Sequence, residues 1–196
     1  MRRGGGDRRK DVVHIFTEDS TTEPRYSNWL KRRQDRFSVT VDDQHGKPRE
    51  LLAYALELRR SWRRSDSNMS VWCVFDRDEH ASVDDVICQA EQEGIRIAFS
   101  HPCFQYWLLL HFCDSAPPCA GRCREADRRL EKEMPGYQHT VPMPWLAAQL
   151  EGRYAKAKAR AQRVQAQHDR DGIVLPTQRD PSTNIWELID HLGVSY

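Results

Sequence analysis

The chain has no long apolar segment and no marked excess of charge, and both absences exclude classes of protein. No run approaches the roughly eighteen apolar residues of a transmembrane helix. Residues 1–10 are rich in arginine and glycine and contain no apolar leader core. We therefore expect a flexible basic arm at 1–10, no membrane partner and a cytoplasmic protein. Thirty basic and 29 acidic side chains nearly cancel, so a nucleic-acid-binding surface would have to be a local patch.

Cysteine is also sparse, with six residues in 196. Without a secretory leader, this usage favours reduced thiols over a disulfide framework. One group has spacings that could hold a structural zinc ion between a helix end and a loop, although it lacks a clean pair of CxxC knuckles. Ordinary buried thiols and a core histidine are the favoured alternative for its members, which are His111, Cys113, Cys119 and Cys123.

Short apolar runs alternate with amphipathic stretches in the first half of the chain. Alternation of this kind is typical of βαβ units, which build a parallel sheet with right-handed crossovers. We predict an α/β fold with a four-stranded, mainly parallel, Rossmann-like sheet between helices. The predicted strands are 12–16, 37–41, 71–75 and 95–99, and the predicted helices between them are 23–34, 47–64 and 82–94.

The second half of the chain has mainly helical patterns. Residues 104–112 form an apolar and aromatic run that predicts a buried helix, and 124–133, 144–170 and 183–192 are predicted helices. Residues 172–182 are predicted to form a loop. We therefore divide the chain into the arm at 1–10, a core at 11–112 and a helical extension at 113–196 that packs on the core.

Acidic residues follow two of the predicted strands. Glu18 comes after the first, Asp76 and Asp78 come after the third, and Glu23 lies in the first turn of the helix after Glu18. In parallel sheets, ligands bind outside the carboxyl ends of the strands. Carboxylates gathered there repel one another unless a cation compensates, and oxygen ligands favour Mg²⁺ or Mn²⁺. Each acid alone is typical of a loop or a helix terminus, but the combination predicts a metal site for phosphate chemistry.

Five ordered blocks between about Val12 and Leu188 resemble the RloB family. They are Phe16-Thr17-Glu18, Thr22-Glu23-Pro24-x-Tyr26, Phe75-Asp76-x-Asp78, the run from Ser100 to Phe112, and Asp180-Pro181-Ser182-Thr183-Asn184.

The resemblance implies a Toprim-like core and a nuclease. Proteins of this family look like minimal Toprim proteins of restriction-modification and abortive-infection loci, related to antiphage effectors that work with an ATPase partner. By this resemblance Glu18 matches the general acid or base, Asp76 and Asp78 match the metal-binding pair, and Glu23 matches a second acid of the nuclease branch.

Two positions depart from the family pattern. Asp19 stands after Glu18, where a glycine is common, so the turn differs or a further carboxylate joins the site. Gln105 stands where the family pattern leads us to expect an acid. If that acid were a ligand, this chain would bind metal more weakly; if it were structural, little would change.

A row of basic residues recurs on one face of the predicted helix 144–170. Such a row could follow a nucleic-acid backbone in a salt-dependent way with little sequence preference, and a solvated helix face is an equal alternative. The row consists of Arg153, Lys156, Arg160 and Arg163.

These features together predict a Mg²⁺- or Mn²⁺-dependent nuclease that hydrolyses RNA or DNA. One alternative is a non-catalytic Toprim-like binding subunit of a defence complex, which Asp19 and Gln105 keep open. A nucleotidyl transferase is the other. The chain is short for that class and shows no obvious zinc ribbon or tyrosine-nucleophile domain.

Overall fold

The sheet has one more strand than the sequence predicts. The computed structural model describes residues 10–62, 68–77, 82–113 and 119–196. The strands β1 (Val12–Thr17), β2 (Ser38–Val41), β3 (Met69–Asp76), β4 (Arg96–His101) and β5 (Ser182–Thr183) form one sheet in the order β2-β1-β3-β4-β5. The first four are parallel, and β5 is antiparallel to β4. The mainly parallel α/β sheet is confirmed, but the predicted number of four strands is wrong, because a two-residue strand is too short to show a periodic pattern.

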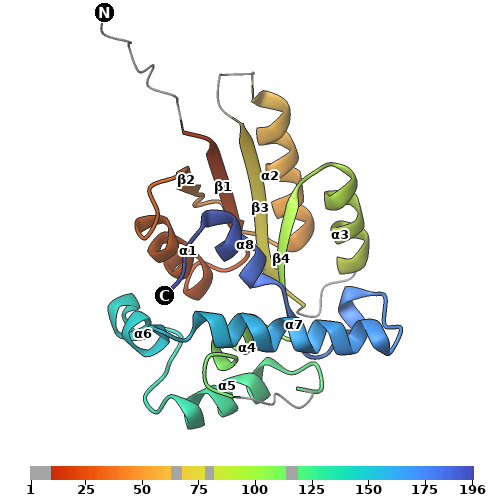
Figure 1. Cartoon of the computed structure of the whole chain (residues 1–196). Coiled ribbons are helices and arrows are strands. Elements are labelled where there is room, and N and C mark those ends of the chain that lie inside the picture. Colours follow the sequence, from red (N-terminus) through yellow and green to blue (C-terminus); the bar gives the residue numbers. More distant parts are fainter. Residues whose placement is uncertain (1–9, 63–67, 78–81, 114–118) are drawn as a thin grey trace, which may run out of the picture.

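Helices cover both faces of the sheet (Figure 1). Helices α2 (Pro48–Ser61) and α3 (Val83–Gln92) pack on one face, and α1 (Thr22–Arg32) and α8 (Ile185–Leu192) pack on the other. The sheet therefore has a hydrophobic core on each face, and alternate residues of β3 point into one core or the other. Cys73 packs in the core under α2 and α3, whereas Trp72 and Val74 pack in the core under α1 and α8. Burial on both faces explains why the central strands β1 and β3 are mainly apolar, whereas the edge strand β2, with the sequence Ser-Val-Thr-Val, alternates between exposed and buried residues.

The remaining helices gather at the carboxyl ends of the parallel strands (Figure 1). They are α4 (Phe104–Leu109), α5 (Cys123–Glu133), α6 (Met143–Leu150) and α7 (Tyr154–Arg170), and the 3-10 helix η1 (Pro176–Gln178) follows. The single helix predicted for 144–170 is divided into α6 and α7 at Gly152, whose φ of 74° is incompatible with a continuous right-handed helix. Within the described ranges, no helix is both long and apolar enough to cross a membrane.

A buried aromatic network joins α1, α4 and the last residue of the chain. The hydroxyls of Tyr26 and Tyr196 are hydrogen-bonded, and Trp107 Nε1 donates to Tyr26 Oη at 2.9 Å. His111 Nε2 lies 3.1 Å from Tyr196 Oη, and its Nδ1 lies 3.1 Å from the carbonyl oxygen of Trp107. The prediction that His111 is a satisfied core histidine is confirmed. Burial lowers its pKa to about 4.

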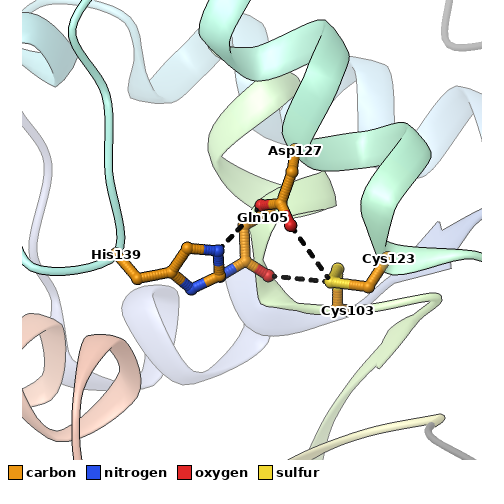
Figure 2. Close-up of a disulfide and its surroundings, with 5 residues drawn as sticks. All are labelled: Cys103, Gln105, Cys123, Asp127 and His139. Carbon is orange, nitrogen blue, oxygen red and sulfur yellow. Dashed lines mark hydrogen bonds and ion pairs between the residues drawn. A yellow bond between two sulfur atoms is a disulfide. The ribbon is translucent and has the colours of Figure 1, made fainter.

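One pair of cysteines forms a disulfide, contrary to the expectation of reduced thiols throughout. Cys103 precedes α4 and Cys123 begins α5, and the packing of these helix starts brings the two Cα atoms to 5.5 Å (Figure 2). The two cysteines are 20 residues apart in the sequence, and no sequence pattern predicted that they would come together. Among the zinc candidates, Cys123 is therefore bonded to Cys103 and His111 is hydrogen-bonded in the core, while Cys119 is buried and Cys113 is partly buried.

Candidate functional site

Glu18 and Asp76 meet at the carboxyl ends of two neighbouring strands. The parallel register of β1 and β3 pairs Thr17 with Val74. The next residue extends the pairing, because the Glu18 N–H donates to the carbonyl of Val74 at 3.0 Å. The Asp76 N–H in turn donates to Glu18 Oε2 at 3.0 Å. This bond fixes the Glu18 carboxylate against the end of β3. The predicted convergence of these two acids is thus present in the fold.

Glu23 lies beneath this pair and organises the loop that carries Glu18. Its side chain begins in the first turn of α1 and the residue is only 2% exposed. Glu23 Oε2 accepts hydrogen bonds from the N–H groups of Glu18 at 3.1 Å and Asp19 at 3.4 Å. The carboxylate therefore holds the backbone of the β1–α1 loop in place.

The electrostatics of the cluster favour added positive charge. Burial raises the pKa of Glu23 well above its ordinary value, and the carboxylates of Asp76, Asp19 and Glu18 raise it further. These causes mean that negative charge here is both desolvated and repelled by its neighbours. A proton or a cation at this edge would relieve both effects.

Asp19 closes the turn after Glu18 through two hydrogen bonds with Thr21. Its Oδ1 accepts from the Thr21 N–H at 2.9 Å and its Oδ2 accepts from Thr21 Oγ1 at 2.9 Å. Such side-chain bonding to the backbone two residues ahead is typical of Asx turns. Asp19 thus shapes the loop, and it also adds negative charge beside Glu23.

The fourth predicted acid, Asp78, lies outside the described residues. In the described ranges, no three acidic, histidine or cysteine side chains are arranged as a ready-made metal site. The acids that the fold does bring together are Glu18, Asp19, Glu23 and Asp76.

Gln105 belongs to a hydrogen-bonded chain that sequence reasoning missed (Figure 2). Its Nε2 lies 3.1 Å from His139 Nδ1, and His139 Nε2 lies 3.0 Å from Asp127 Oδ1. Burial raises the pKa of Asp127, and His139 opposes this shift. Arg25 of α1 donates to the His139 carbonyl at 3.1 Å, which links the chain to the helix that carries Glu23. No motif or spacing marked Asp127 and His139, because they come from separate segments of the helical part.

The basic row on α7 is only partly exposed. Arg153, Lys156 and Arg163 are exposed, as a nucleic-acid-binding surface requires. Arg160 is 9% exposed, and its Nη1 donates to the carbonyl of Leu110 at 2.7 Å. Arg160 therefore does not share the exposure of the other three, because this side chain turns inward to bind the end of the α4 segment, and nucleic-acid binding by the row stays a prediction.

The geometry defines a class: a mainly parallel α/β protein with a carboxylate cluster at the carboxyl ends of its central strands. Comparison with protein families places the chain within that class more closely. It belongs to the family described as RloB-like protein, whose model matches residues 13–192. No curated protein and no solved structure matched the chain.

Proposed function

We propose that this protein is a metal-dependent nuclease of the Toprim type, which hydrolyses phosphodiester bonds of RNA or DNA. The observation that carries the proposal is the convergence of Glu18 and Asp76, with Glu23 buried behind them, at the carboxyl ends of β1 and β3. Ligand sites of parallel α/β sheets occur at this end. The Toprim resemblance implies the same order, with a glutamate after the first strand, β1, and an aspartate at the end of the neighbouring strand, β3.

The donor set fits Mg²⁺ or Mn²⁺. All the converging side chains are carboxylates, which these cations prefer. Burial, and then the neighbouring carboxylates, raise the pKa of Glu23, and a nearby cation would oppose both effects. Glu18, Asp76 and Asp78 are the residues that would hold the ion. When bound, it would polarise the scissile phosphate and lower the pKa of a bound water.

The two glutamates have different parts in this proposal. The Glu18 carboxylate is oriented by the Asp76 N–H and is suited to take or give a proton beside the metal. Glu23 keeps the Glu18 backbone in position, and a bound cation would favour the ionised form of this buried carboxyl group. Exposed Arg153, Lys156 and Arg163 would contact the phosphate backbone.

The biological setting is proposed from the family alone. An RloB-like chain would act as an antiphage abortive-infection effector, restrained or licensed by an ATPase partner. A non-catalytic binding subunit is the alternative. It is favoured by Gln105, which is engaged with His139 where the family pattern suggests an acid.

Induced expression in cells tests catalysis without knowledge of the substrate. Wild type, Asp76→Ala and Asp85→Ala would be compared, with and without a neighbouring ATPase gene; Asp85 is an exposed aspartate on α3 and serves as the matched control. We expect growth arrest and fragmented RNA or DNA with wild type and Asp85→Ala, and neither with Asp76→Ala. Identical behaviour of all three under every condition, including phage challenge, would leave the binding subunit.

A further inference from the structure

A cavity of about 550 Å³ lies at the outer edge of β4, away from the acidic cluster. It opens where β5 stops: β5 pairs only with Ser100 and His101, so the earlier part of β4 is paired with β3 on one side and, among the described residues, with no strand on the other. Apolar side chains from different elements line it, among them Ile87 of α3 and Ile97 and Phe99 of β4. The volume is within the range of about 300–1,000 Å³ that is typical of small-ligand pockets. None of the acidic cluster residues lines it.

An acidic side chain, Glu187, and a basic side chain, Arg96, both line this cavity. Glu187 of α8 is half-buried, and burial raises its pKa, while hydrogen bonding from Asn184 and the nearby Arg96 oppose the shift. The Glu187 carboxylate offers acceptors only, and the Arg96 guanidinium offers donors only. Arg96 also lies over the Trp72 ring at 5.4 Å, which holds it beside the cavity. A ligand edge with neighbouring donor and acceptor groups would match this pair.

Exposed apolar side chains lie at the entrance of the cavity. Val174, which lines the cavity, is 78% exposed, and its neighbour Leu175 is 44% exposed. In the part of the chain that the structure describes, these are the exposed large hydrophobic side chains. Exposed apolar side chains beside a hollow are typical of binding sites. A flat ring that enters the cavity would cover Val174 as well as Ile97.

Addition of a peptide strand to β4 is a poorer explanation of the open edge. Asn184 Oδ1 accepts from the Phe99 N–H at 2.6 Å, and its Nδ2 donates to the Ile97 carbonyl at 3.0 Å. The Asn184 backbone N–H also donates to the Phe99 carbonyl. These bonds occupy three of the backbone groups that an added strand would need, the Phe99 N–H and the carbonyls of Phe99 and Ile97. The cavity therefore offers side-chain contacts and volume rather than a free strand edge.

We propose that the β4-edge cavity binds a nucleobase, with Glu187 and Arg96 pairing to its polar edge and Ile97 and Val174 contacting its faces. A purine edge combines an N–H donor with a neighbouring acceptor, and its faces are apolar. The base comes either from a free nucleotide or from an unpaired position of a nucleic acid. The site is independent of the proposed metal chemistry.

Calorimetric titration of the purified full chain tests the site. The probes are adenosine and guanosine monophosphates, with ribose 5-phosphate as a ligand that lacks the base, all in the presence of a metal chelator so that the acidic cluster does not contribute. We expect at least one of the two nucleotides to bind and the sugar phosphate not to bind. Absence of binding by both nucleotides at millimolar concentration, or equal binding of ribose 5-phosphate, would overturn the proposal.

Three variants assign the binding to this cavity. Glu187→Gln should weaken binding about tenfold or more, because a hydrogen bond to a charged group is lost. Val174→Asp should also weaken it, and this exposed side chain can be changed without disturbing the core. Glu93→Gln, at an exposed glutamate that ends α3 outside the cavity, should bind as wild type does. Unchanged affinity in both Glu187→Gln and Val174→Asp would refute the assignment.

Competition identifies the source of the base. A single-stranded oligonucleotide that displaces the bound mononucleotide would show that the cavity accepts a base from nucleic acid. An oligonucleotide that leaves the mononucleotide bound would identify a free nucleotide as the ligand.

Discussion

Protonation of one buried histidine should govern much of the acid sensitivity of this fold. His111 is 1% exposed, and burial lowers its pKa from 6.5 to about 4. In the unfolded chain the ring takes up a proton near pH 6.5, whereas in the folded chain it stays neutral until about pH 4. The free energy of unfolding is therefore unaffected by this group above pH 6.5 and falls as the pH decreases below that value.

The difference between the two pKa values sets the size of the effect. It corresponds to roughly 3 kcal/mol once the pH is below both values, of which about 2 kcal/mol is already lost at pH 5. Most natural domains have only about 5–15 kcal/mol of stability, so the loss is readily measurable.

Urea unfolding of wild type and His111→Gln between pH 7.5 and pH 5 measures this contribution. The substitution removes the pH-dependent contribution of His111, since glutamine does not titrate, and every other effect of the substitution is the same at each pH. The gap between the two proteins should therefore change by about 2 kcal/mol from pH 7.5 to pH 5, with an unchanged denaturant dependence. Parallel pH profiles for the two proteins would refute the reasoning, because the other titrating groups are common to both.

Three further outcomes are expected. Glu23→Gln should unfold at the same or a higher temperature than wild type at pH 7. Burial and neighbouring carboxylates raise the pKa of Glu23, so the ionised carboxylate lowers the stability of the fold as the pH rises above 4.5. A clear drop in melting temperature would contradict this. Arg160→Ala should lose about 1–3 kcal/mol of unfolding free energy, since the Leu110 carbonyl loses its buried donor, whereas exposed Lys156→Ala should change it by less than about 0.5 kcal/mol; equal losses would refute the inward placement. A reducing agent should lower the unfolding free energy by about 3 kcal/mol, the value for a loop of this length, and should have no effect on Cys103→Ser.

Residues with local, periodic patterns were predictable from the sequence. The apolar runs of β1, β3 and β4 gave the parallel sheet because strands buried on both faces need continuous apolar residues. Placing Glu18 and Asp76 together required only that β1 and β3 be neighbours, and the fold makes them so.

Features that depend on long-range packing were not predictable. Strand β5 is two residues long and exists because Thr183 and Asn184 bond to β4. The inward turn of Arg160 depends on the position of the Leu110 carbonyl, 50 residues away. The approach of Cys103 to Cys123 follows from the packing of α4 and α5, which no local spacing reveals.

The central claim is that the acids at the ends of β1 and β3 form a divalent-cation site. Titration of the purified chain with Mn²⁺, followed by electron paramagnetic resonance, measures this directly for wild type, Asp76→Asn and the exposed control Asp85→Asn. We expect wild type and Asp85→Asn to bind Mn²⁺ and Asp76→Asn to bind it far more weakly. Equal binding by all three proteins, or no binding by wild type, would contradict it.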